Sequence, residues 1–115
     1  MKALLSIIIP MYNSERYIVR CFESLRRLKI RKEVIVVDDG SSDGSYDIAR
    51  KFASNGEIKL FHQENKGVSE ARNLGLDRCS GDVVVFVDSD DFIIGEGFQS
   101  MYNNFTLSKA EMAMG

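Results

Sequence analysis

Three acidic residues, Asp88, Asp90 and Asp91, stand together after the apolar run 83–87. Carboxylates this close repel one another unless a divalent cation or a ring of hydrogen-bond donors takes up the charge. Mg²⁺ and Mn²⁺ prefer oxygen ligands and are commonly held by one or two carboxylates plus substrate phosphates. Asp88-Ser89-Asp90 therefore predicts a metal and diphosphate site. A solvated turn or the start of a helix explains the same residues, and this stretch alone leaves both readings open.

Three more loops carry polar residues that could take part in chemistry. They follow three other apolar runs, at 4–9, 33–37 and 58–62. If the runs are parallel strands, their carboxyl ends meet at one edge of the sheet, where open α/β sheets bind ligands. Each motif is weak alone, and the set is much stronger. The loops are Pro10-Met11-Tyr12-Asn13-Ser14-Glu15, Asp38-Asp39-Gly40-Ser41-Ser42-Asp43 and the stretch from Glu64 to Asn73.

The elements that position these loops alternate between strand and helix. Helical apolar spacing after the first run, with Asn13 or Ser14 as cap, predicts the first helix. A second helix ends at 55–56, a third holds Val68 to Cys79, and a fourth follows Gly97. Residues 110–114 resemble the start of a fifth strand. This order predicts an α/β fold with three α/β/α layers and a mainly parallel, twisted sheet, forming one domain over residues 1–115.

Composition narrows the class of protein. The chain has 115 residues, 44% of them hydrophobic, and a net charge of -2, so nucleic acid is not expected as a partner. The two cysteines, Cys21 and Cys79, fall at helical apolar positions and suggest neither a disulfide framework nor a zinc cluster. The N-terminal apolar run is too short to span a membrane. A cytoplasmic protein is expected. His62, the one histidine, stands at a strand end, which favours a structural role.

Taken together, the four loops resemble those of the inverting family 2 glycosyltransferases, which have the GT-A fold with a Rossmann-like nucleotide-binding half. The similarity covers essentially the whole chain and includes the D-x-D motif at 88–90. It implies binding of a nucleotide-diphosphate sugar, most often a UDP-sugar, together with Mn²⁺ or Mg²⁺. It also implies transfer of the sugar to a hydroxyl of a glycan or lipid-linked acceptor, in polysaccharide or glycoconjugate synthesis.

The resemblance assigns roles for the base of the nucleotide. Tyr12 offers a flat face for a pyrimidine, and a half-buried core tyrosine is the plain alternative. Asp39 can accept the imide hydrogen of uracil, which would select uracil over cytosine. Pro10 belongs to the same loop as Tyr12. Glu15 matches a commonly acidic family position, although shielding of a helix start explains it equally well.

For the diphosphate, the resemblance points to cations and to a close backbone approach. Lys66 and Arg72 supply positive charge, and Gly67 lets the backbone come near at a helix start. Asp90 is the first choice as metal ligand, and Asp88 holds the ribose or a metal-bound water. The full predicted set is Pro10, Tyr12, Glu15, Asp39, Lys66, Gly67, Arg72, Asp88 and Ser89 for the nucleotide sugar, with Asp90 and Asp88 for the metal.

The resemblance also implies missing parts. Family members extend beyond this length, and the acceptor pocket and the catalytic base belong to the part that follows, so no base is assigned. The chain is expected to be a truncated donor half, inactive at transfer by itself, attached to a membrane only peripherally and prone to self-association through an open sheet flank. One alternative is a non-catalytic nucleotide-binding or oligomerisation module. The other is a receiver-type phosphoacceptor domain, which is disfavoured because the acidic residues of this chain follow different strands from those of a receiver domain.

Overall fold

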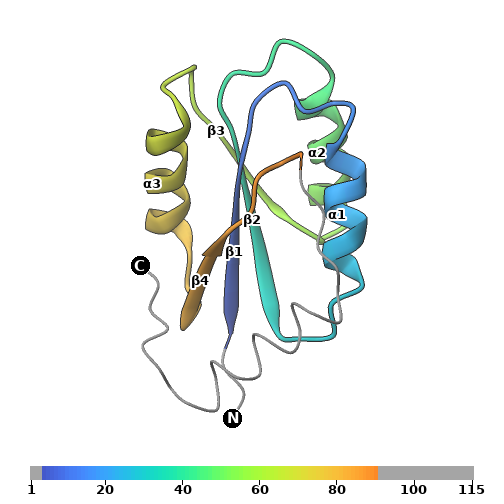
Figure 1. Ribbon diagram of the computed structural model, residues 1–115, viewed down its shortest axis with the longest axis vertical. Coiled ribbons are helices and arrows are strands. Elements are labelled where there is room, and N and C mark those ends of the chain that lie inside the picture. The colour runs from blue at the N-terminus through green and yellow to red at the C-terminus, as the bar shows by residue number, and fades with distance from the viewer. Residues whose placement is uncertain (1–3, 91–115) are drawn as a thin grey trace.

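A computed structural model describes residues 4–90 of the chain. Its parallel sheet has four strands in the order β3-β2-β1-β4 (Figure 1). Three helices connect the strands, so that the chain alternates between the two element types as predicted. The bounds are β1 Leu5–Met11, α1 Ile18–Arg26, β2 Lys32–Asp38, α2 Ser45–Ser54, β3 Lys59–His62, α3 Val68–Arg78 and β4 Val83–Phe86.

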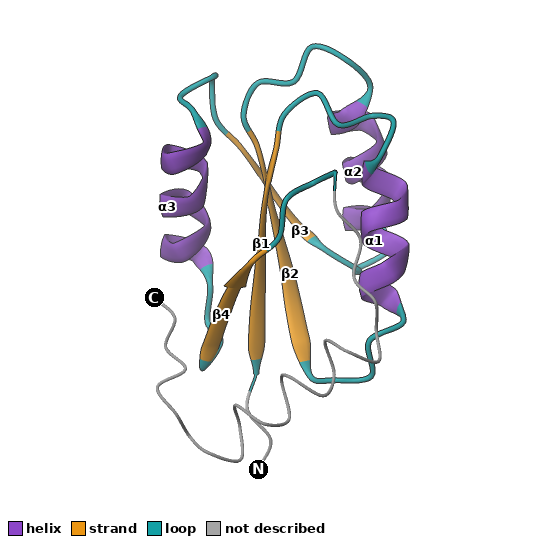
Figure 2. Ribbon diagram, viewed as in Figure 1, coloured by secondary structure: helices purple, strands orange, loops and turns teal. Residues whose placement is uncertain are grey.

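The sheet forms the middle of three layers. Helices α1 and α2 cover one face and α3 covers the other (Figure 2). The larger core packs Ile7, Ile9 and Val36 against α1 and α2, and the smaller one packs Ile8 and Ile35 against α3. Side chains of a strand alternate between faces, so one continuous apolar run serves both cores. The prediction of a three-layer α/β fold is confirmed.

Strand β1 continues past Pro10 to Met11, whereas the sequence predicted that the proline would end it. The backbone explains the difference. The Ile8 carbonyl accepts the Val87 N–H on the β4 side, so Pro10, two residues on, faces that side too. The β4 ladder has already ended there, with Ile8 opposite Phe86 as its last pair. The missing proline N–H therefore costs no sheet hydrogen bond.

The prediction that 83–87 is a fully buried strand is wrong. Within residues 4–90, β4 lies at an outer position of the sheet and pairs with β1 alone. Val84, Val85 and Phe86 are accordingly only half-buried. An uninterrupted apolar run indicates burial on both faces of a central strand, but it cannot tell which strand is central. The inner positions belong to β1 and β2.

The predicted caps of the first helix are also wrong. The turn before α1 is held by the Ser14 carbonyl, and no side chain caps the helix. The side chain of Asn13 instead accepts the Ser42 and Asp43 N–H groups across the loop. Cys79 directly follows α3 and is not inside it. The predictions for Asp91, the fourth helix and the fifth strand lie outside the described residues.

None of the helices within residues 4–90 is long and apolar enough to cross a bilayer.

Candidate functional site

Two adjoining pockets lie among the loops that follow β1, β2 and β4, with Pro10 and Tyr12 in the lining of both. The parallel strands bring these loops to one end of the sheet (Figure 1). Tyr12 is 49% exposed and lines both pockets. The two pockets differ in chemistry, one being largely apolar with a single carboxylate and the other rich in oxygen atoms.

The smaller pocket, of about 190 Å³, lies between the end of β1 and the first turns of α3. Asp39 is its polar residue, and the carboxylate is only 6% exposed. An aromatic ring, aliphatic side chains and one hydrogen-bonding group suit a flat heterocycle with a polar edge. The lining residues are Pro10, Met11, Tyr12, Asp39, Val68 and Ala71.

Asp39 holds the loop between β3 and α3. Its Oδ1 accepts the Lys66 N–H at 2.6 Å and the Gln63 amide at 2.9 Å, and its Oδ2 accepts the Gly67 N–H at 3.0 Å. These donors satisfy a buried carboxylate that would otherwise be costly. Each carboxylate oxygen can accept about two hydrogen bonds, so Oδ2 retains one free acceptor position.

The larger pocket, of about 350 Å³, opens between the loop after β1 and the loop after β4. Asp88 and Asp90 are exposed at its rim, and Ser89 is buried. The Ser89 hydroxyl is hydrogen-bonded to the Ser14 hydroxyl, which fastens the D-x-D turn to the loop after β1. The pocket is lined by Pro10, Tyr12, Asn13, Ser14, Tyr17, Asp88, Ser89 and Asp90.

Arg72 extends from α3 toward the D-x-D turn. Its Nη2 lies 4.0 Å from Asp88 Oδ1, and the guanidinium carbon lies 5.6 Å from the ring centroid of Phe86. Its Nε is buried and has no hydrogen-bond partner within the described residues. The Phe86 ring lies beside the guanidinium, whose nitrogens keep donor capacity. Such a group is suited to an anion such as a phosphate.

Four residues of the predicted set, Glu15, Lys66, Gly67 and Arg72, are not in the lining of the two adjoining pockets. The Lys66 backbone holds Asp39, but its side chain lines another pocket, together with His62 and Glu70. Glu15 Oε1 accepts the Gly44 N–H at 2.9 Å, at the start of α2. Neither side chain lines the two adjoining pockets. Gly67 has φ of +99°, a conformation that glycine adopts without strain.

The acidic residues fit a hard cation only together with a ligand. Residues 4–90 contain no cluster of three or more His, Cys, Asp or Glu side chains suited to a metal. Asp88 and Asp90 nevertheless share the rim of one pocket. Two carboxylates, with phosphate and water completing the shell, are the usual protein contribution to Mg²⁺ sites. The residues present therefore fit Mn²⁺ or Mg²⁺ as a partner of a bound diphosphate.

Sequence reasoning missed Gln63 and Tyr17. Gln63 fixes Asp39 from the end of β3, and Tyr17, 45% exposed, lines the D-x-D pocket from the start of α1. Neither residue belongs to a recognisable sequence motif. An apolar helical position and a single amide become informative only once the fold brings them to the site.

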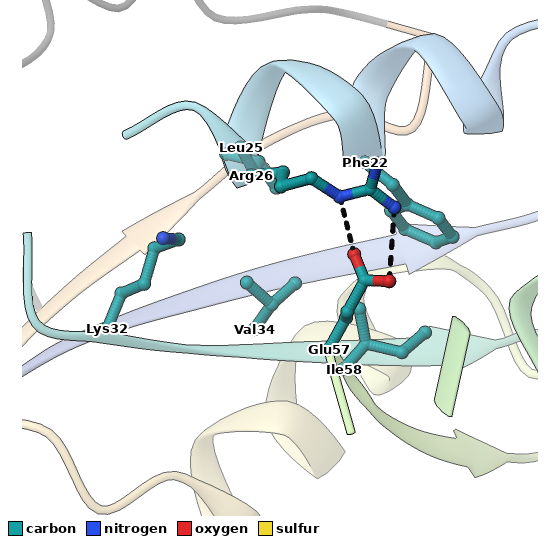
Figure 3. Close-up of a pocket in the computed structure, with 7 residues that line it drawn as sticks. All are labelled: Phe22, Leu25, Arg26, Lys32, Val34, Glu57 and Ile58. Atoms are coloured by element: carbon teal, nitrogen blue, oxygen red, sulfur yellow. Dashed lines mark hydrogen bonds and ion pairs between the residues drawn. The ribbon is translucent and has the colours of Figure 1, made fainter. Parts of the chain in front are cut away.

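A separate pocket lies at the opposite end of the sheet, beneath the last turn of α1. Arg26 and Glu57 bridge it through two hydrogen bonds of 2.9 and 3.0 Å (Figure 3). The Lys32 amine donates to the Leu28 carbonyl at 2.9 Å, and burial lowers the pKa of this amine. This pocket lies near the amino ends of β2 and β3, whereas the two adjoining pockets lie at the carboxyl ends of the strands. It therefore forms no part of the candidate site.

Comparison with solved structures supports this fold. The crystal structure of Staphylococcus aureus TarS 1–349 in complex with UDP-GlcNAc matches with a TM-score of 0.81 and 35% identity, covering 93% of this chain and 32% of TarS 1–349. Mannosyltransferase PcManGT from Pyrobaculum calidifontis, solved with GDP-Man and Mn²⁺, matches with a TM-score of 0.81, covering 96% of this chain and 33% of PcManGT. Its 24% identity supports the fold alone.

Sequence comparison identifies the family. Glycosyltransferase GlyA of Streptococcus pneumoniae serotype 4 is 38% identical over 113 residues, which is 96% of this chain and 16% of GlyA. GlyG of the same organism is 33% identical in an alignment of 118 positions, which covers 100% of this chain and 39% of GlyG. This chain thus spans less than half of either relative. The family model described as Glycosyl transferase family 2 matches residues 6–115, and the chain therefore belongs to that family.

Proposed function

We propose that this chain binds a nucleotide-diphosphate sugar, with uridine as the nucleoside, in a protein that transfers the sugar to an acceptor hydroxyl with inversion. The main support is the pair of adjoining pockets that share Pro10 and Tyr12. A nucleoside diphosphate has a flat base at one end and an anionic group at the other. The two pockets match these ends in chemistry, and TarS, at 35% identity, has been crystallised with UDP-GlcNAc.

In this proposal the base lies in the smaller pocket. The exposed ring of Tyr12 stacks on it, and the free acceptor position of Asp39 Oδ2 takes the imide hydrogen of uracil. Cytosine has no hydrogen at that ring position, so the same carboxylate disfavours it. Because Asp39 is buried and already fixed by three donors, it meets the base without reorganising.

The diphosphate then lies in the larger pocket. Arg72 donates hydrogen bonds to a phosphate oxygen, and Gly67 opens the start of α3 to the ligand. Lys66, whose side chain lines a separate pocket, contributes through its backbone N–H to Asp39, and Glu15 supports the site through the start of α2. Asp90, assisted by Asp88, would hold Mn²⁺ or Mg²⁺. When bound, the metal ion neutralises charge on the departing nucleoside diphosphate.

The remaining parts of the proposal concern the whole protein. The catalytic base lies outside this chain, so the chain alone serves the donor and not the transfer. The acceptor is a glycan or lipid-linked hydroxyl in polysaccharide or glycoconjugate synthesis. We place the protein in the cytoplasm, with peripheral membrane association, and propose that this chain self-associates.

Titration calorimetry with UDP, with and without Mn²⁺, tests the proposal. We expect Mn²⁺ to strengthen UDP binding, and Asp90→Ala to remove that enhancement, because the substitution deletes the metal-binding carboxylate. Asp47→Ala is the matched control, since Asp47 is an exposed aspartate on α2, away from both pockets. Equal Mn²⁺ enhancement in the Asp90→Ala variant would contradict the metal assignment. Absence of UDP binding under every condition would contradict the nucleotide assignment.

A further inference from the structure

His62 stands between two carboxylates. Its Nδ1 lies 3.0 Å from Asp38 Oδ2, and its Nε2 lies 3.0 Å from Glu64 Oε2. Asp38 is only 1% exposed at the end of β2, and Glu64 is an exposed residue of the loop after β3. The imidazole therefore connects the buried end of one strand to the loop that leaves its neighbour.

Both contacts can exist only when the ring is protonated. An ionised carboxylate accepts hydrogen bonds and donates none, and a neutral imidazole carries one N–H. The imidazolium carries two, one for each carboxylate. Deprotonation must therefore break one of the two bonds. The hydrogen bonds to Glu64 and then Asp38 raise the pKa of His62 above its usual 6.5, so this change takes place at a higher pH than in a free imidazole.

Other side chains lie around His62 as well. The Tyr46 ring on α2 lies nearly perpendicular to the imidazole, with centroids 5.7 Å apart, and offers no charge. Lys66, Glu70 and Asp77 line the same pocket as His62. Among these groups the acidic side chains, with Asp38 and Glu64, outnumber the single lysine. Asp38 and Glu64, the two carboxylates that contact the ring, are the charges that stabilise the imidazolium.

The two strand ends that His62 joins also carry the base pocket. Gln63, the next residue, donates its N–H to the Asp38 carbonyl and its side-chain amide to Asp39, each at 2.9 Å. Asp39 in turn holds the N–H groups of Lys66 and Gly67, directly before α3. Losing one end of the His62 link removes one of the bonds that hold this loop and leaves those of Gln63 and Asp39 in place, so the loop is held less tightly on one side of the pocket.

We propose that the imidazolium of His62 is a positioning residue for the nucleotide site, fixing the loop 63–67 so that Asp39 and α3 meet the base in one geometry. This inference rests on the proposed function, and it adds a pH dependence to that site. Nucleotide affinity should be highest while His62 is charged and should fall as the pH rises through its pKa. The effect acts through Asp39 and does not require His62 to touch the ligand.

Binding of UDP-GlcNAc, measured by calorimetry from about pH 5.5 to about pH 8.5, tests the inference. This ligand has no terminal phosphate, a group that would titrate near pH 6 and obscure the result. We expect a fall in affinity of about two- to tenfold across the range, as for one lost hydrogen bond. The His62→Gln variant should bind at the weaker level throughout, and Glu64→Gln should move the midpoint to lower pH.

A second readout needs no ligand. His62 is the one histidine of the chain, so its ring signals in an NMR titration are unambiguous. The amide signal of Gly67 should shift with the same midpoint, and this shift should vanish in His62→Gln. An unchanged pH profile in His62→Gln, or a Gly67 amide that ignores the His62 titration, would overturn the inference. Absence of UDP-GlcNAc binding at every pH would instead count against the proposed function, while the Gly67 signal would still test the loop coupling.

Discussion

At the scale of single residues, Arg72 has a hydrogen-bond donor that no acceptor within residues 4–90 satisfies. Its plane lies over Phe86, one nitrogen approaches Asp88, and a buried nitrogen has no partner within residues 4–90. A buried donor without an acceptor costs free energy, and the terminal nitrogens of the same guanidinium are free to donate to an anion. The same helix offers a comparison, because Arg78 lies 5.3 Å over the ring of Phe61 in an equivalent stack.

Arg72→Ala should therefore weaken UDP binding by about ten- to hundredfold, as expected for a lost charged hydrogen bond. Arg72→Lys should restore only part of the affinity, because an ammonium lacks the planar fork of the guanidinium. Arg78→Ala removes an equivalent arginine stack away from the pockets and should leave the affinity unchanged. Titration calorimetry of the three variants checks this prediction, and equal losses in Arg72→Ala and Arg78→Ala would reduce Arg72 to a packing role.

At the scale of elements, α3 can lie close to the sheet because two of its buried residues are small. Ala71 and Gly75 are four residues apart, so they share the face turned toward β1 and β2. A Cβ built on Gly75 would stand 2.4 Å from Cγ2 of Ile8, a side chain buried at the centre of the sheet. The position of α3, and with it the positions of Arg72 and Val68, thus depends on the absence of a side chain at Gly75.

Gly75→Ala should destabilise the fold by about 1–3 kcal/mol, the usual cost of overpacking, although alanine favours helices. Urea unfolding followed by circular dichroism measures the change. Ser69→Ala, at an exposed position of the same helix, gains helix propensity without a clash and should leave stability equal or slightly higher. A Gly75→Ala protein as stable as the unchanged chain would show that Ile8 moves aside at little cost.

The strands and helices also show which structural features can be predicted from the sequence. The predicted strand runs lie within two residues of β1 to β4, because β-branched runs and helical apolar spacing are local signals. The outer position of β4 and the continuation of β1 through Pro10 depend on pairing between distant segments, which no local pattern contains. The same holds within the site. Arg72 and Asp88 were expected near one diphosphate and do approach each other, whereas the partners of Glu15 and Asn13 are backbone groups of another loop.

At the scale of the whole molecule, different sets of hydrogen bonds hold the two ends of the sheet. The carboxyl end carries the pockets, whose hydrogen bonds cross between loops. The amino end is held by Glu33, whose side chain is 8% exposed. Its carboxylate accepts the Ser6 hydroxyl at 2.5 Å, the Ser80 N–H at 2.6 Å and the Lys59 amine at 2.9 Å. One side chain thereby joins β1, β2, β3 and the link from α3 to β4.

Stability should therefore depend on the ionisation of Glu33. Although burial acts in the opposite direction, hydrogen bonds from Ser6, Ser80 and Lys59 lower its pKa from 4.5 to about 2. A lowered pKa means that this contribution is fully present above pH 4.5 and is lost as the pH falls through 2. Glu33→Gln should cost about 1–3 kcal/mol in urea unfolding at pH 7, and distinctly less near pH 3. Glu23→Gln, at an exposed site on α1, should change little at either pH. A cost for Glu33→Gln that stays constant with pH would mean that the shape of the side chain, and not its charge, joins the strands.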